Sequence, residues 1–271
     1  FLTPMDVPEQ VPAREGWIEV AGARLWYWDT GGEGPAVVLL HPATGSGQIW
    51  GYQQPVLAKA GFRVIGYSRK HHAKSEITAV EEMESDAEDL HRLVQALKLG
   101  RIHAIGSAAG GGIVMQYAAK HPQSLLSMTI ACSLGSVRDQ RYREACLAVR
   151  PAGFYSLSPE FRELRPCYRA ADREVTRRWI ALVKSSRSGR VRQPSPADTV
   201  DVTWEKLAAS KVPCLLVGGD ADLYLPPPLL EYCHDRLPGS QMVLINGAGH
   251  SAYWEQPRLF NEAVLKFLNS R

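Results

Sequence analysis

Short apolar runs alternate along the chain with longer amphipathic stretches. Eight apolar runs have the length and composition of β-strands, and they cover residues 17–20, 25–28, 36–40, 63–67, 102–105, 126–131, 214–218 and 241–245. Apolar residues three and four positions apart between residues 80 and 97 predict an amphipathic helix, and further helices are expected to end near residue 120 and to cover residues 257–268. This alternation predicts an α/β fold whose mostly parallel sheet is covered by helices on both faces.

The alternation stops between about residues 135 and 200, where helical stretches rich in arginine take its place. It resumes with the strand expected at residues 214–218. We therefore expect one α/β core, formed by residues 1–134 and 201–271, into which residues 135–200 are inserted. A chain of 271 residues can bury such a core without disulfides.

The composition narrows the class of protein. Hydrophobic residues make up 45% of the chain and charged residues 22%, as in soluble globular proteins. No apolar run approaches the roughly 20 residues of a membrane span, and the first residues do not have the pattern of a signal peptide. Five widely spaced cysteines without a CxxC pair favour a reducing, cytoplasmic setting and argue against a zinc site.

Positive charge is concentrated in the predicted insertion. Residues 138–192 contain 14 Lys or Arg against 6 Asp or Glu, whereas the formal net charge of the whole chain is only +3. These side chains either form a solvated helix surface or make a positive cap that attracts anionic substrates. No nucleic-acid partner is expected, because the basic residues are not interleaved with a stacking platform or a known binding motif.

A glycine-rich turn follows the strand expected at residues 102–105. It reads Gly106-Ser107-Ala108-Ala109-Gly110-Gly111, and its glycines permit a sharp strand-to-helix turn that holds the middle residue out at the top of the sheet. Such turns also serve helix packing and phosphate binding. The turn alone therefore does not identify a catalytic site.

Two later segments add candidate catalytic groups. Gly219-Asp220-Ala221-Asp222 follows one strand and Gly247-Ala248-Gly249-His250 follows the last one. Both segments place a polar residue at the carboxyl end of a strand, where open α/β sheets keep their sites. The chain order is thus turn, acid, histidine.

With these segments, and with His41-Pro42-Ala43 after the third strand, the chain resembles the α/β-hydrolase superfamily over nearly its whole length outside the insertion. The resemblance implies an eight-stranded, mostly parallel sheet with a helical lid inserted after the sixth strand. It implies that His250 is the general base, that Asp222 orients it, and that the backbone N–H groups of Ala43 and Ala109 form an oxyanion hole. No cofactor is implied.

The chain departs from that family at the nucleophile. The family turn reads G-x-Ser-x-G, and position 108 is alanine here, whose methyl group cannot attack a carbonyl. One explanation is a variant whose serine was replaced and which is inactive for that reason. A second is an enzyme in which His250 acts as a base without a serine, and a third is a pseudoenzyme that only binds ligand.

Other positions carry weaker predictions. Asp220 is an alternative acid to Asp222. Residues 67–75 are expected to form a charged surface loop, with Arg69 as an anchor beneath the site in the alternative interpretation. Candidate substrate-binding residues are His41, Ser107, Tyr168, Trp179, Tyr224 and Tyr253.

The sequence thus predicts a lidded hydrolase of a small organic ester, lactone or C–C-bonded diketone, impaired by Ala108. The alternatives are a non-hydrolytic lyase, cyclase or cofactor-free oxygenase that uses His250, and a ligand-binding pseudoenzyme. The expected partner is a small molecule, without a metal, nucleic acid or membrane. The arginines and residues 70–74 make an anionic substrate plausible. The oligomeric state cannot be read from the sequence.

Overall fold

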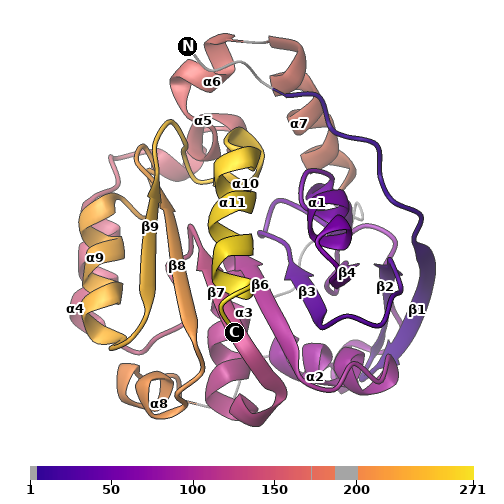
Figure 1. The fold of residues 1–271 in the computed structure, drawn as a ribbon. Coiled ribbons are helices and arrows are strands. Elements are labelled where there is room, and N and C mark those ends of the chain that lie inside the picture. Colours follow the sequence, from indigo (N-terminus) through magenta and orange to yellow (C-terminus); the bar gives the residue numbers. More distant parts are fainter. Residues whose placement is uncertain (1–4, 172, 187–200) are drawn as a thin grey trace.

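A computed structural model describes residues 5–171, 173–186 and 201–271, and it contains one mixed β-sheet (Figure 1). The strands are β1 (Arg14–Val20), β2 (Ala23–Asp29), β3 (Ala36–Leu40), β4 (Arg63–Tyr67), β5 (Glu76–Ile77), β6 (Ile102–Ser107), β7 (Leu125–Ala131), β8 (Cys214–Gly219) and β9 (Gln241–Ile245). Their order is β1-β2-β4-β3-β6-β7-β8-β9, and β5 pairs with β2. In the sheet order, all neighbouring strands from β4 through β3, β6, β7 and β8 to β9 are parallel. The eight expected strands are present, and within the described residues the two-residue β5 is added to them.

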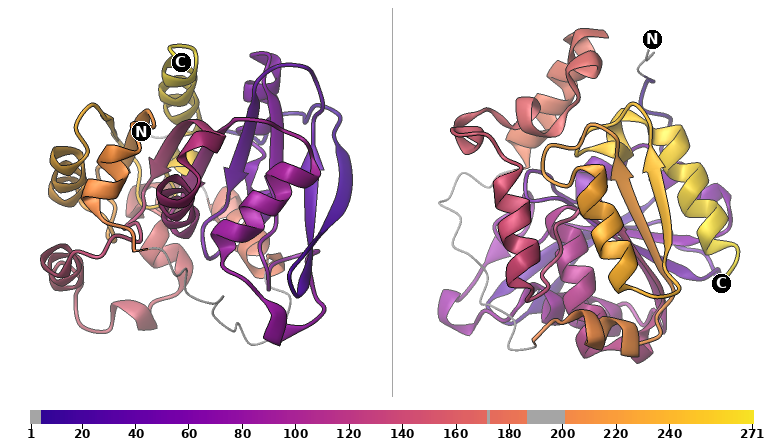
Figure 2. Two further views of the ribbon diagram at one scale, coloured as in Figure 1. Left: turned by 90° about the horizontal axis from the view of Figure 1, so that it is seen from below. Right: turned by 90° about the vertical axis from the view of Figure 1, so that its left-hand side faces the viewer.

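The central strands are apolar on both faces because helices cover both. Val38 and Leu40 of β3 pack in one buried cluster with side chains of α2 (Asp86–Ala96), α3 (Ala109–Lys120) and α9 (Pro227–Arg236). Val37 and Leu39 point the other way, into a cluster with α1 (Gln54–Lys59) and α11 (Pro257–Leu268). Figure 2 shows α1 and α11 on one side of the sheet and α2 and α3 on the other. This two-sided burial explains the continuous apolar runs of the sequence.

The helix expected over residues 80–97 is shorter in the structure. A 3₁₀ turn at Val80–Glu82 is followed by extended backbone at Met83, and α2 begins at Asp86. Ser85 ends the extended stretch because its side chain accepts a hydrogen bond from the Glu88 N–H and caps the helix. The apolar spacing correctly indicated the buried face, but not the start of the helix.

The inserted segment contains α4 (Gln140–Ala148), α5 (Pro159–Glu163), α6 (Pro166–Ala171) and α7 (Arg173–Ser185), with a 3₁₀ turn at Phe154–Ser156. Helix α4 lies beside α9, and its Tyr142 and Cys146 belong to the core. Helices α5 to α7 lie above the carboxyl ends of the strands (Figures 1 and 2). The predicted end of the insertion, at residue 200, falls within residues 187–200 and outside the described residues. Helix α8 (Trp204–Ala209) leads back into the sheet.

The prediction of a charged surface loop at residues 67–75 was wrong. Ser68, Arg69, Lys70 and His72 are all buried. Lys70 forms a 2.8 Å ion pair with Asp89 of α2, and Arg69 forms a 3.3 Å ion pair with Asp86. The loop therefore fixes α2 beneath the carboxyl end of β4, and Arg69 is an anchor.

Candidate active site

The sharp turn between β6 and α3 is centred on Ala108. Its φ of 49° and ψ of −114° lie outside the regions that alanine normally adopts, and such a residue typically costs about 1–3 kcal/mol. The turn requires glycine on both sides, since a Cβ at Gly106 would lie 2.4 Å from the Gly110 carbonyl and one at Gly110 would lie 2.1 Å from the Leu40 carbonyl oxygen. The glycines thus allow α3 to approach β6 and β3 closely.

The backbone around Ala108 is held from the neighbouring strand. The Ala108 N–H donates to the carbonyl oxygen of Ala131, at 2.9 Å, where β7 ends. The Ser133 hydroxyl donates to the Ala108 carbonyl oxygen and accepts from the Gly135 N–H. The strained turn is therefore rigidly placed, although it presents only a methyl group.

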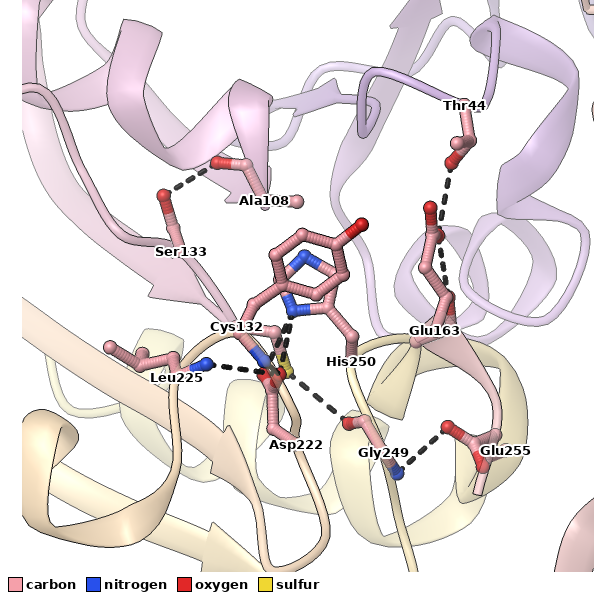
Figure 3. Close-up of polar contacts among 12 residues, drawn as sticks. Thr44, Ala108, Cys132, Ser133, Glu163, Asp222, Leu225, Gly249, His250 and Glu255 are labelled. Carbon is pink, nitrogen blue, oxygen red and sulfur yellow. Dashed lines mark hydrogen bonds and ion pairs between the residues drawn. The ribbon is translucent and has the colours of Figure 1, made fainter. Parts of the chain in front are cut away.

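His250 and Asp222 meet at the carboxyl ends of β8 and β9. Nδ1 of His250 lies 2.9 Å from both carboxylate oxygens of Asp222. Asp222 Oδ1 also accepts the N–H groups of Tyr224 and Leu225, at 2.7 and 3.1 Å. Asp220 instead accepts from the backbone N–H groups of Gly247 and Ala248, so it braces the loop that carries His250. In Figure 3 the His250 ring lies between Asp222 and Ala108.

The surroundings of His250 favour its protonated form. Burial alone lowers the pKa of His250, but the Asp222 carboxylate, supported by Glu163, outweighs burial and raises the pKa above its usual value. The Tyr224 ring lies against the imidazole, with 4.2 Å between the centroids. Because Asp222 engages Nδ1, Nε2 is the ring nitrogen left for a bound molecule.

Two histidines hold the loop that follows β3. His41 Nε2 accepts the Arg69 N–H at 3.0 Å, which places the His41 proton on Nδ1, and Nδ1 donates to the Pro42 carbonyl at 2.7 Å. His72 Nδ1 contacts the Gly45 carbonyl at 2.7 Å. These bonds fix the backbone on both sides of Ala43. The Ala109 N–H belongs to the first turn of α3, where N–H groups have no partner within the helix.

The inserted segment is docked on the loop that carries His250 (Figure 3). The Glu163 carbonyl accepts the Ser251 N–H, and the Glu255 carboxylate accepts the N–H groups of Gly249 and Arg165 at 2.8 and 2.7 Å. Burial raises the pKa of Glu255 to about 8. A Cβ at Gly249 would lie 2.8 Å from the Glu163 carbonyl oxygen. Glycine at position 249 therefore lets the two segments touch.

A cavity of about 630 Å³ opens among these elements. Of the predicted site residues, Ala43, Ala108, Ala109, Tyr224 and His250 line it, and Asp222 lies directly behind His250. The other lining residues are Pro42, Thr44, His71, His72, Ser133, Leu134, Gly135, Arg162 and Glu163. The structure thus brings the predicted nucleophile position, base and oxyanion loop to one cavity.

Five predicted substrate-binding residues are not among those that line this cavity: His41, Ser107, Tyr168, Trp179 and Tyr253. Each is at most 1% exposed. His41 supports the loop after β3, and the Ser107 hydroxyl is buried without a hydrogen-bond partner among the described residues. The three aromatic residues belong to the core cluster on the α1 and α11 face of the sheet. Only Tyr224 of the six candidates lines the cavity.

Sequence reasoning missed the cavity residues Thr44, Ser133, Arg162 and Glu163. Arg162 and Glu163 lie in the insertion, where no motif marks a position, and their burial depends on the docking of α5. Thr44 could have been suspected because it follows Ala43. Glu163 connects distant segments, since its Oε2 accepts hydrogen bonds from Thr44 at 3.0 Å and Ser251 at 3.4 Å.

Cys132 is not a substitute nucleophile. Burial raises the pKa of its thiol well above the usual value, and its Sγ contacts the Gly249 carbonyl oxygen at 3.8 Å. A buried neutral thiol is a poor nucleophile. Within the described residues, no group of three or more His, Cys, Asp or Glu side chains could hold a metal ion. No helix among them is long and apolar enough to cross a bilayer.

Comparison with known proteins agrees with this geometry. A family model described as alpha/beta hydrolase fold matches residues 35–144, and one described as TAP-like protein matches residues 187–270. A Synechocystis protein provisionally named a non-heme chloroperoxidase is 28% identical over an alignment of 264 positions that covers 89% of this chain and 94% of that protein. A Bacillus subtilis protein provisionally named a 2-succinyl-6-hydroxy-2,4-cyclohexadiene-1-carboxylate synthase is 27% identical over 88% of this chain and 93% of its own length.

The solved structures show the same architecture. An N-acyl homoserine lactone degrading enzyme is 25% identical and superposes with a TM-score of 0.74 over 93% of this chain and 100% of its own. The sheet order, the sharp turn after β6 and the matched family model together establish the relationship. The chain belongs to the α/β-hydrolase superfamily.

Proposed function

We propose that this chain is a carbonyl-directed α/β-hydrolase of esterase or lactonase type, whose nucleophile position is occupied by Ala108. The observation that carries the proposal is the strained turn at Ala108 beside an intact Asp222–His250 pair. Residues with a backbone conformation of this kind cluster at active sites and ligand-binding sites. The similarity to a lactone-degrading enzyme supports acyl chemistry.

In a serine form, the hydroxyl at position 108 attacks the carbonyl carbon and His250 Nε2 takes its proton. Asp222 stabilises the resulting imidazolium, and the N–H groups of Ala43 and Ala109 stabilise the oxyanion. His250 then returns the proton to the leaving group, and water hydrolyses the acyl-enzyme. With alanine, the same pocket binds the acyl compound but forms no covalent intermediate.

The test compares the unaltered chain with Ala108→Ser on short-chain aryl esters and lactones, with a fluorophosphonate as covalent probe. We expect labelling at residue 108 in the serine form and a turnover advantage of up to about 10⁶-fold. The matched control is the double variant Ala108→Ser with His250→Ala, which lacks the base. A folded Ala108→Ser protein that is neither labelled nor active would disprove the assignment of position 108.

A second candidate function is favoured by Nε2 of His250, the ring nitrogen that does not contact Asp222. The ring lines the cavity and keeps Nε2 toward it, so a base is present even without a serine. The chain as it stands could therefore act on carbonyl compounds by proton transfer alone. One relative is named as a synthase of a cyclohexadiene carboxylate, which supports this class.

We also propose that the substrate carries an anionic group. Arg162 lines the cavity and donates to the Tyr224 hydroxyl at 2.9 Å, and the Arg150 guanidinium lies 5.4 Å from the Tyr224 ring centroid. Nε of Arg162 and both Nε and Nη2 of Arg150 are buried without an acceptor among the described residues. Lys70 does not contribute, because its ion pair with Asp89 is buried.

Calorimetric titration with phenylacetate and with its neutral amide tests this class of substrate. We expect the carboxylate to bind more tightly, and its affinity to fall with salt and in Arg162→Gln. Arg178→Gln is the matched control, since Arg178 is an exposed arginine of α7 that pairs with Asp6. Equal binding of the amide and the carboxylate would contradict an anionic substrate.

A further inference from the structure

The cavity contains a carboxyl group that neither the family motifs nor the proposed hydrolysis uses. Glu163, at the end of α5, is only 4% exposed, yet it lines the cavity together with His250. Burying a carboxyl group is expensive unless it has partners or a function. Figure 3 shows Glu163 beside Thr44, on the side of the cavity formed by the loop after β3.

Only half of this carboxyl group is engaged. Oε2 accepts hydrogen bonds from the hydroxyls of Thr44 and Ser251, whereas no residue among those described donates to Oε1. Thr44 directly follows Ala43, whose N–H group belongs to the proposed oxyanion hole. The carboxyl group thus lies beside the loop of the proposed oxyanion hole, and its second oxygen is available to a molecule bound in the cavity.

We propose that Glu163 is a catalytic residue of this cavity, which donates a proton to the oxygen of a bound carbonyl compound while His250 removes a proton from the adjacent carbon. The proposal rests on the roles assigned above to His250 and the oxyanion hole. It adds an activity that needs no serine, namely enolisation of a ketone or a related carbonyl compound.

The proposed step balances as follows. Nε2 of His250 takes the proton, the electron pair of the broken C–H bond becomes a C=C bond, and the carbonyl oxygen takes the proton of the Glu163 carboxyl. The products are an enol, an imidazolium and a carboxylate. The reverse step, after His250 has exchanged its proton with the solvent, returns a solvent hydrogen to the carbon.

The step requires a protonated Glu163 and a neutral His250 at the same time. The raised pKa of Glu163 favours this state, whereas the raised pKa of His250 limits it to the molecules in which the imidazole has lost its proton. Burial raises the pKa of Glu163 above its usual value, although His250, Thr44 and Arg162 oppose the increase, so the carboxylic acid persists to higher pH. Groups that influence His250 are the Asp222 and Glu163 carboxylates, the Arg150 guanidinium and the Tyr224 ring. Arg150 is the one of these that opposes protonation of the imidazole.

Hydrogen exchange into a simple ketone tests the proposal on the full chain. Cyclohexanone and 4-oxocyclohexanecarboxylate, which adds the anionic group proposed above, are each incubated with the protein in D₂O, and loss of the hydrogens next to the carbonyl is followed by proton NMR. We expect exchange above the buffer rate with the unaltered chain, none with His250→Ala, and a decrease of about 100-fold or more with Glu163→Gln. Glu160→Gln, on the same helix but outside the cavity lining, is the matched control and should exchange like the unaltered chain.

A second variant covers the case in which Glu163→Gln does not fold. Thr44→Val keeps the carboxyl group but removes a hydrogen bond to its charged form, so a larger fraction of Glu163 should keep its proton at alkaline pH and exchange there should be faster than in the unaltered chain. The proposal is overturned by exchange no faster than in buffer, by equal exchange in folded Glu163→Gln, or by unchanged exchange at alkaline pH in Thr44→Val. Fluorophosphonate labelling of Ala108→Ser is independent of these results, so failure of the hydrolase assignment remains distinguishable.

Discussion

Single residues decide how closely the backbone can approach itself around the site. Gly106, Gly110 and Gly249 each stand where an added methyl group would collide with a backbone carbonyl of another segment. Ala108 is the opposite case, because it adopts a positive φ that a glycine would accept more easily. The cavity thus depends on the absence of side-chain atoms at three positions and on backbone strain at a fourth.

Two glycines of α3 provide a matched prediction. In Gly110→Ala, the new Cβ would lie 2.1 Å from the Leu40 carbonyl oxygen, so α3 must shift and the free energy of unfolding should fall by about 1–3 kcal/mol or more. In Gly112→Ala, the nearest atoms lie at 3.5 Å, and higher helix propensity should stabilise the protein by up to about 1 kcal/mol. Urea unfolding of both variants checks the difference; equal effects would show that the close approach is not limiting.

Elements are positioned largely by polar contacts that cross between them. The loop after β4 is attached to α2 through Arg69 and Lys70, and it supports the loop after β3 through His41 and His72. Loops normally lie at the surface. This one is buried because two ion pairs and several hydrogen bonds satisfy its charged groups.

The Lys70–Asp89 pair predicts strong coupling between the loop and α2. Removing one partner, as in Lys70→Met, leaves the other charge buried and should cost about 3–5 kcal/mol of unfolding free energy. The double variant Lys70→Met with Asp89→Leu should recover most of this loss, because no buried charge remains. A double-mutant cycle measured by denaturant unfolding checks this, and additive losses would contradict a direct interaction.

The same contacts explain which elements the sequence predicted. Strands such as β3 and β9 were predicted to the residue, because the signal for a strand is a short apolar run that lies within the strand itself. The start of α2 was missed because a serine cap outweighs apolar periodicity, and the buried loop was missed because its charged residues find partners 17 and 19 positions away. Glu163 was missed for the same reason: its contacts with Thr44 and Ser251 span 119 and 88 positions.

For the whole molecule, buried carboxyl groups connect stability to pH. Burial raises the pKa of Glu255 to about 8, so the folded protein retains a proton that the unfolded chain has released at neutral pH. The stabilising contribution of this proton is complete below the unfolded pKa near 4 and is lost as the pH rises through the folded value. Glu255 therefore contributes a decline in the free energy of unfolding between about pH 4 and pH 8.

Glu255→Gln is expected to flatten this decline, since an amide does not titrate. The free energy of unfolding measured by urea between pH 5 and pH 8 should depend less on pH in the variant than in the unaltered chain. Glu160→Gln, a change at a partly exposed position, should leave the slope as it is. An unchanged slope in Glu255→Gln would show that this carboxyl group is ionised in the folded protein at neutral pH.

The docking of residues 163–165 on Gly249 and Glu255 limits how this protein can be recombined with its relatives. An insertion taken from a relative would also need a glycine at position 249 and an acidic residue at position 255, because these two contact it. Both positions lie more than 80 residues further along the chain. A chimaera that exchanges the insertion alone would disturb the very loop that carries His250. In this protein the insertion and the loop that carries His250 therefore have to be exchanged together, although they are far apart in the sequence.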